Sequence, residues 1–254
     1  MAQRPIAAAL SRYLLDVDDE LATEFDMRTR LAVRPGTTVR VLVADSGDCD
    51  LGPAFAALDQ GLGLLVIDGL IAFDTEVGDR TATELIGAGD LIAPSTHRIG
   101  AMLDCHAEWR VLVRAQMALL DAEFAARMRP WPQIVQALLR RAARRTADVD
   151  EMRAIACHPR LEVRLDLLFW HLAARWGRVE PSGIRLTLPL THRLLGQLVA
   201  AERPSISHAL GRLSAAGLVT GSAGDWHLLG TVERHVEALA DHTLTVGGRA
   251  QAQA

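Results

Sequence analysis

The stretch from Arg203 to Arg212 carries hydrogen-bond donors and contains no carboxylate. Its polar or charged members are Arg203, Ser205, Ser207, His208 and Arg212. Arginine and histidine can donate to O6 and N7 of guanine in the major groove, and small hydroxyl groups can bond either bases or phosphates. These residue types therefore indicate contact with DNA, although a basic surface helix without a ligand would show the same composition.

Two short helices are expected to position these donors. The first covers residues 192–200, with Thr191 as its N-cap. Its inner face is formed by Leu194, Leu195, Leu198 and Val199. The second begins near Pro204, whose missing N–H is harmless in a first helical turn. It buries Ile206, Leu210 and Leu213 at the spacing of a helical stripe. The predicted DNA-binding residues are completed by Thr191 and Arg193 of the first helix.

The segments around these helices follow the order of a winged helix-turn-helix. An amphipathic helix, RLEVRLDLLFWHLAARW, is stopped by Gly177, and a strand-like stretch, IRLTLPL, follows it. After the two short helices comes VTGSAGDWHLLG, which indicates a strand, a glycine-rich turn and a second strand. This order predicts a DNA-binding domain over residues 159–254.

The N-terminal part predicts an antiparallel sheet with a helix before it. Residues 5–30 have a helical apolar period. Further along, short β-branched runs such as VRVLVAD and EWRVLVR alternate with glycine and aspartate turns. Within GLGLLVIDGLIAFD, the pair Asp68-Gly69 is a hairpin signal. The even spacing favours a sandwich or a rolled antiparallel barrel over residues 1–131.

A long glycine-free segment, PQIVQALLRRAARRTADVDEMRAIA, predicts a helix over residues 132–158, ended by His158-Pro159. Its apolar residues approach a heptad seam. The seam residues are Val135, Leu138, Ala142, Val149 and Met152. Arg145 interrupts the seam. Such a helix suits dimerisation, and packing against the core of its own domain is the alternative.

Composition limits the remaining functions. The 254 residues are half hydrophobic with a net charge of −4, so the chain can build a core and any anion-binding surface must be local. No apolar run suits a membrane span or a signal peptide, so a cytoplasmic location is expected. The three cysteines, Cys49, Cys105 and Cys157, form no CxxC pair, which argues against a disulfide framework and local metal ligation. No nucleophile–base pair, phosphate loop or HExxH motif indicates an enzyme.

Residues 191–213 resemble the helix-turn-helix of the Crp/Fnr family of bacterial transcription regulators. The matching residue types are Thr191, Gly196, Gln197, Val199 and Arg203. The pieces GLLVIDGLIAF and IGAGDLI resemble the family's cyclic-nucleotide-binding β-roll. The resemblance implies an α+β fold with an N-terminal antiparallel β-roll, a long dimerisation helix and a C-terminal winged helix-turn-helix. It also implies a homodimer that binds a (pseudo)palindromic operator in double-stranded DNA, with RNA polymerase as a further partner.

The predicted recognition helix departs from the family pattern. Pro204 stands where the family has a glutamate, and His208 stands where it has a second arginine, so the usual half-site is not expected. Ala200 replaces the glycine of the turn. A ligand-binding or protein-interaction module, whose winged helix no longer reads DNA, is the alternative function.

The sensor region lacks the residues that the resemblance implies for a cyclic nucleotide. Between Asp90 and Asp104 there is no acid, and the single arginine, Arg98, lies outside a Pro-Arg-Ser/Thr-Ala motif. A buried phosphate without a placed arginine would be poorly compensated. We therefore expect no binding of cAMP or cGMP, no cofactor, and an effector that the sequence does not identify. Surface or core positions, rather than haem ligation, are expected for His97, His106 and Cys105.

Overall fold

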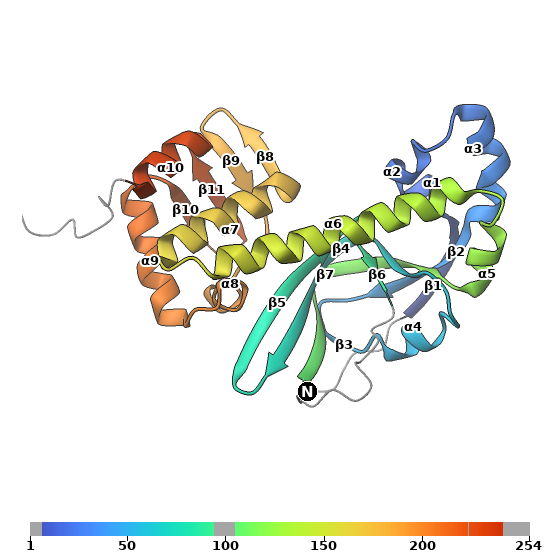
Figure 1. Cartoon of the computed structure of the whole chain (residues 1–254), viewed down its shortest axis with the longest axis horizontal. Helices are drawn as coiled ribbons and strands as arrows, with labels where there is room; N and C mark the ends of the chain where they lie inside the picture. The colour runs from blue at the N-terminus through green and yellow to red at the C-terminus, as the bar shows by residue number, and fades with distance from the viewer. Residues whose placement is uncertain (1–6, 94–104, 223, 241–254) are drawn as a thin grey trace, which may run out of the picture. The chain divides into compact units, whose positions relative to one another are not determined.

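The computed structural model describes residues 7–93, 105–222 and 224–240 (Figure 1). It divides into two compact units, Met1–Val149 and Asp150–Ala254. The boundary lies within the long helix α6 (Pro132–Ala156). Within the described part of the chain, no helix combines the length and the apolar character needed to cross a bilayer.

The N-terminal unit is built on an antiparallel sheet, as the sequence predicts. The sheet has the strand order β1-β2-β7-β4-β5, with β3 paired to β7 and β6 paired to β4. The strands are β1 (Ala7–Tyr13), β2 (Thr38–Ala44), β3 (Gly47–Cys49), β4 (Gly63–Val77), β5 (Arg80–Gly87), β6 (Leu91–Ile92) and β7 (Cys105–Leu120). Apolar residues of β4, β5 and β7 enclose one core, which includes Val66, Ile86 and Met117.

The hairpin predicted at Asp68-Gly69 is wrong, because β4 continues through these residues. The pairing of β4 with β7 extends from Gly63↔Leu120 to Val77↔Cys105, and its register shifts on either side of Asp68. Gly69 has φ +96°, and a Cβ there would lie 2.4 Å from the carbonyl oxygen of Arg114. The Asp-Gly pair therefore forms a bulge inside a long strand, where glycine permits close approach of the neighbouring backbone.

The N-terminal segment begins with a strand where the helical period predicts a helix. Residues Ala7–Tyr13 pair with β2, and Leu10 is 77% exposed. Short helices follow, and aspartates start two of them: Asp18 accepts from the N–H of Leu21 and Asp26 from that of Thr29, both at 2.9 Å. These caps divide the apolar period into short pieces. The helical elements of this unit are α1 (Leu14–Val17), α2 (Asp19–Ala22), α3 (Met27–Val33), the 3-10 helix η1 (Arg34–Thr37), α4 (Gly52–Ala56) and α5 (Ala122–Arg127).

The N-terminal half of α6 is part of the core of this unit. Ile134, Ala137 and Leu138 pack in one cluster with residues of α1, α5 and the sheet. Leu138 is only 2% exposed. The assignment of Leu138 to a dimer seam is therefore wrong, because its side chain is already buried within its own domain.

Four arginines of α6 form ion pairs with carboxylates of the N-terminal unit. Arg141 is almost fully buried and binds both carboxylate oxygens of Asp18, at 2.6 and 2.7 Å. Arg145 binds Glu84 of β5 in the same two-bond manner, at 2.6 and 2.9 Å. The other two pairs are Arg140–Glu24 and Arg144–Glu20. These contacts explain why an arginine interrupts the apparent heptad: Arg145 faces its own domain.

The C-terminal unit has the predicted order of a winged helix-turn-helix. Its four-stranded antiparallel sheet has the order β10-β11-β9-β8. Its elements are α7 (Leu161–Trp176), β8 (Gly177–Glu180), β9 (Gly183–Leu186), α8 (His192–Val199), α9 (Arg203–Ala215), β10 (Val219–Ser222), β11 (Asp225–Leu229) and α10 (Val232–Ala240). Phe169 and Trp226, whose ring centroids are 5.1 Å apart, join α7 to the sheet.

A buried histidine–aspartate contact joins the last described helix, α10, to α7. Nδ1 of His235 lies 2.5 Å from Oδ1 of Asp166, and Nε2 lies 3.0 Å from the carbonyl oxygen of Leu229. Both side chains are almost completely inaccessible to solvent. Both ring nitrogens therefore contact oxygen atoms of other elements, and these contacts attach α10 to α7 and to the end of β11.

Candidate nucleic-acid interface

Helices α8 and α9 form the predicted pair. Thr191 caps α8, since its hydroxyl accepts from the N–H of Leu194 at 3.2 Å. Pro204 lies in the first turn of α9. All the residues predicted to face inward are buried: Leu194, Leu195, Leu198, Val199, Ile206, Leu210 and Leu213. The spacing of apolar residues was therefore sufficient to predict which sides of these helices remain exposed.

The turn between the two helices is tight. Ala200 ends α8 in the left-handed conformation, with φ 54° and ψ 53°. A Cβ on Gly196 would lie 2.4 Å from the carbonyl oxygen of Ala201, so only glycine fits there. Arg164 of α7 donates to the carbonyl oxygens of Val199 and Ala200, at 3.0 and 3.4 Å. These contacts fix the position of α9 relative to α8.

Replacement of Ala200 by glycine should stabilise the C-terminal unit. A left-handed residue with a Cβ costs about 1–2 kcal/mol, whereas the greater freedom of glycine in the unfolded chain offsets part of the gain. We expect a net increase of about 0.5–1 kcal/mol in the free energy of unfolding, measured by urea denaturation. Ala201→Gly is the matched control, because φ at Ala201 is not positive. It should destabilise the unit, and equal effects of the two changes would contradict the argument.

The predicted DNA-binding residues lie on the exposed sides of α8 and α9. Thr191 and Arg193 are exposed at the start of α8. Along α9, the exposed side chains include Arg203, Ser205, Ser207 and His208. The first turn of α9 contains no acidic residue. The structure thus brings together donors from two helices on one unit.

Arg212 differs from the other predicted contacts. It lies in the last turn of α9 and forms an ion pair with Glu162 of α7. Glu162 is buried, and a buried carboxylate is unfavourable without such a partner. We therefore assign Arg212 to the packing of α9 against α7 rather than to base contacts. Helical position alone predicted its direction but not a partner fifty residues away.

His192 lies between two of the predicted contacts, but it was not itself predicted to contact DNA. It is the first residue of α8, between the cap Thr191 and Arg193. Its Nδ1 lies 2.9 Å from Oγ of Ser207, so it connects the two helices. The sequence did contain a signal for this role, because His192 directly follows the predicted N-cap Thr191. Side chains in the first turn of a helix lie close to a ligand bound at its N-terminus.

The hairpin β10–β11 brings a carboxylate close to β9. Asp225 accepts two hydrogen bonds from Arg185, at 2.8 and 2.9 Å. The hydrogen bonds from Arg185 lower the pKa of Asp225, and the same bonds raise the pKa of Arg185.

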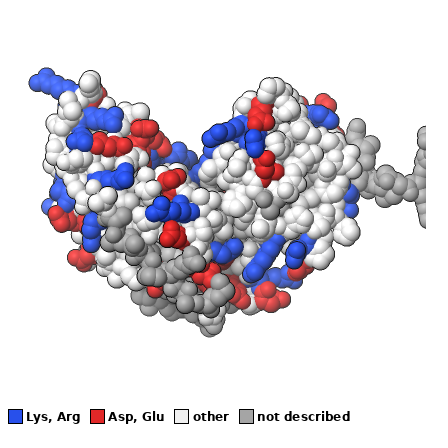
Figure 2. Space-filling view, turned by 180° about the vertical axis from the view of Figure 1, so that it is seen from behind, with Lys and Arg blue, Asp and Glu red and all other residues white. Residues whose placement is uncertain are grey.

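On the face seen in Figure 2, basic and acidic side chains are interspersed over both units. The donors of α8 and α9 are thus a local feature, consistent with the small net charge.

The cysteines and histidines of the N-terminal unit form no ligand set in the described residues. Cys49 is buried, and burial together with the charge of Asp50 raises the pKa of its thiol to about 11. Cys105 and His106 are exposed at the start of β7. Across the described ranges, no three His, Cys, Asp or Glu side chains are grouped to hold a metal ion. His97 and Arg98 lie outside the described residues.

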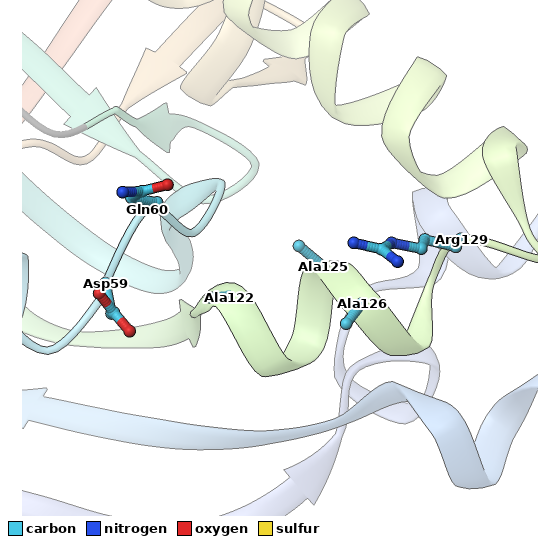
Figure 3. Close-up of a pocket in the computed structure, with 6 residues that line it drawn as sticks. All are labelled: Asp59, Gln60, Ala122, Ala125, Ala126 and Arg129. Carbon is cyan, nitrogen blue, oxygen red and sulfur yellow. The ribbon is translucent and has the colours of Figure 1, made fainter.

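A pocket of about 430 Å³ lies in the N-terminal unit. It is lined by Asp59, Gln60, Ala122, Ala125, Ala126 and Arg129. Figure 3 shows Asp59 and Gln60 on one side and Arg129 on the other, with the alanines between them. Asp59 and Gln60 both have positive φ, 43° and 65°. None of the predicted site residues lines this pocket.

Known proteins share this fold. Residues 163–234 match the Crp-like helix-turn-helix domain. CooA from Carboxydothermus hydrogenoformans, solved as a mutant, is 14% identical with a TM-score of 0.58, over 79% of this chain and 88% of its own. The c-di-GMP-responsive regulator CLP from Xanthomonas campestris is 18% identical with a TM-score of 0.57, over 84% of this chain and all of its own.

A CRP/FNR-family transcriptional regulator from Thermus thermophilus is 16% identical, with a TM-score of 0.54, over 78% of this chain and 98% of its own. No curated protein sequence matches the chain. The similarities confirm the fold that the resemblance predicts, a β-rich N-terminal part followed by a Crp-like helix-turn-helix.

Proposed function

We propose that this chain, which has a Crp/Fnr-type fold, is a sequence-specific DNA-binding transcription regulator and not an enzyme. The observation that carries the proposal is the exposed donor surface of α8 and α9, which the turn at Ala200 and the contacts of Arg164 hold in place. In a helix-turn-helix, the second helix enters the major groove and its N-terminal residues contact base edges. Such a protein acts in the cytoplasm, where it meets DNA and RNA polymerase.

Arg203 and His208 are the residues we assign to base contacts. In the described part of the chain, neither side chain has a protein partner, so both can bind a ligand without breaking an internal bond. Arg203 is the first residue of α9, and Ser205 lies beside it in the first turn. We assign Thr191 and Arg193, at the N-terminus of α8, to phosphates, since helix N-termini favour anions.

A homodimer along α6 is the second part of the proposal. Three predicted seam residues, Val135, Ala142 and Val149, are half-buried within one chain. Leu138, Arg145 and Met152 are spaced seven residues apart and therefore lie on one side of the helix. On this side, Leu138 and Arg145 face their own domain. The residues that directly follow Leu138 and Arg145 are Leu139 and Thr146. Leu139 is 63% exposed, and Thr146 is exposed as well. We therefore propose a seam of Val135, Leu139, Ala142, Thr146 and Val149.

The third part of the proposal is that neither cAMP nor cGMP controls the protein. Both carboxylates of residues 84–90, Glu84 and Asp90, already have internal partners. Glu84 is bound by Arg145, and Asp90 is buried and accepts from the N–H of Gly87 at 2.8 Å. The segment that would hold the phosphate lies outside the described residues, so this part rests on its sequence.

Selection of bound sequences from a random DNA pool by the full-length protein tests the proposal. We expect a palindromic site with half-sites about one helical turn apart, selected equally well with and without cAMP. A single, non-repeated site would contradict the dimer. Enrichment of no sequence at all would favour a ligand-binding or protein-interaction module instead.

Replacement of Arg203 by alanine should weaken specific binding by about 1–3 kcal/mol and relax base preference at one position in each half-site. The physical reason is the loss of a two-bond contact to one base pair. Binding curves against single-base variants of the selected site would measure it. Arg193→Ala is the control: loss of a phosphate contact should weaken binding to all sequences alike and lower the salt dependence. An unchanged base preference in Arg203→Ala would refute its role.

A further inference from the structure

The contact between His192 and Ser207 lies within the proposed DNA-binding surface. Nδ1 of His192 is 2.9 Å from Oγ of Ser207, and the same Oγ is 3.4 Å from the carbonyl oxygen of Arg203. Among the described residues, Nε2 of His192 has no partner. The imidazole is therefore held on one side by α9, and its other nitrogen is free for a ligand.

A serine hydroxyl can hold this ring in either charge state. When His192 is neutral with its proton on Nε2, Ser207 donates to Nδ1. When His192 is an imidazolium, Nδ1–H donates to Ser207, whose own proton turns to the carbonyl oxygen of Arg203. In both arrangements Nε2 carries a hydrogen. Phosphate oxygens only accept hydrogen bonds, so both arrangements suit a phosphate at Nε2.

We propose that His192 contacts a DNA phosphate through Nε2, and that Ser207 is the residue that positions it. The inference rests on the proposed DNA binding and deepens it. It changes the role predicted for Ser207, because the single proton of its hydroxyl is committed to His192 or to Arg203. Ser205 and His208, whose side chains are exposed on the same helix, stay as direct contacts.

Protonation of His192 then becomes part of DNA binding. A phosphate favours the imidazolium over the neutral ring, so the complex takes up a proton and its affinity rises as the pH falls. Other charged or titratable groups on the helices around His192 have fixed partners or fixed charge, apart from His208. On α7 these are Glu162 bound to Arg212, Arg164 bound to carbonyl oxygens, Asp166 in contact with His235, His171 in contact with Glu151, and Arg175 over the ring of Trp176. On α8 and α9 they are Arg193, Glu202, Arg203 and His208.

The experiment measures the dissociation constant of the selected DNA site between pH 6 and pH 8 at constant salt. Two contacts per dimer should make wild-type binding about tenfold tighter at the acidic end. His192→Gln keeps a neutral donor and should bind with the lower affinity at every pH. His192→Arg carries a permanent charge and should bind with the higher affinity at every pH. His208→Gln removes a proposed base contact and should therefore weaken binding at every pH, but it should keep the rise in affinity toward acidic pH that His192 causes.

Variants of Ser207 test the positioning role. Ser207→Ala should weaken binding and reduce the pH dependence, and Ser207→Thr, which keeps the hydroxyl, should restore both. Equal pH dependence in wild type and His192→Gln would overturn the inference while leaving the proposed function intact. Absence of specific binding by the wild-type protein at every pH would overturn both.

Discussion

Leu138→Glu is expected to unfold the N-terminal unit. The side chain is 2% exposed and packs with Leu14, Phe124 and Ile134. Loss of a buried leucine alone costs about 2–5 kcal/mol, and a carboxylate without a partner adds to this cost. Since whole domains are stable by about 5–15 kcal/mol, we expect little folded N-terminal unit in water. Urea denaturation followed by circular dichroism would measure the loss.

Leu139→Glu, at the next position, separates packing within the chain from dimerisation. Its side chain is 63% exposed, so the fold should keep nearly its original stability. In the proposed dimer, the change places like charges near each other across the two-fold axis and should weaken association. Sedimentation at several concentrations would show the monomer. If Leu139→Glu still forms a stable dimer, the dimer interface lies elsewhere on the chain. If Leu138→Glu folds stably, the burial of Leu138 is contradicted.

Arg141→Ala should cost about 3–5 kcal/mol of stability, because it leaves a buried carboxylate without its partner. The guanidinium is 2% exposed, and both hydrogen bonds to Asp18 are short, 2.6 and 2.7 Å. Asp18 is 8% exposed and also caps α2 through the N–H of Leu21. The change therefore destabilises both the attachment of α6 and the start of a short helix. Urea denaturation of the full chain would measure it.

Two further variants test the cause. Arg140→Ala removes the neighbouring ion pair with Glu24. Because the side chain of Arg140 is 60% exposed, the change should lower the free energy of unfolding by at most about 1 kcal/mol. In the double variant Arg141→Met with Asp18→Asn, no charge is buried and the amide oxygen can still cap α2. It should recover much of the lost stability. If it is as unstable as Arg141→Ala, lost packing, and not the unpaired charge, explains the effect.

Local spacing predicted the helices that carry the candidate site, because a helix repeats every 3.6 residues whatever surrounds it. The inward leucines of α8 and α9, the cap Thr191 and the position of Pro204 all follow from residues that are neighbours in sequence. The contacts that distinguish these side chains do not. Ser207 meets His192 fifteen residues away, and Arg212 meets Glu162 fifty residues away. Position on a helix shows which side chains are exposed, but it does not show which are already bound.

The same limit explains the errors in the N-terminal unit. A seam of apolar residues on α6 buries itself equally well against its own domain or against a second chain, so periodicity could not assign Leu138. Arg145 was the informative residue, since its partner Glu84 lies on β5 of the same domain. Asp68-Gly69 has the composition of a turn, but pairing with β7 continues on both sides of it. In each case, contacts distant in sequence overruled a local signal.

The buried contact between Asp166 and His235 places the end of the folded C-terminal domain beyond the region that matches the Crp-like helix-turn-helix, which stops at residue 234. A protein truncated after Arg234 would contain every matched residue and yet lack the histidine that contacts the carboxyl group of Asp166, a side chain only 2% exposed. The helix α10 is therefore not an optional appendage of the DNA-binding domain. Any shortened version meant to fold as the whole domain does must retain it.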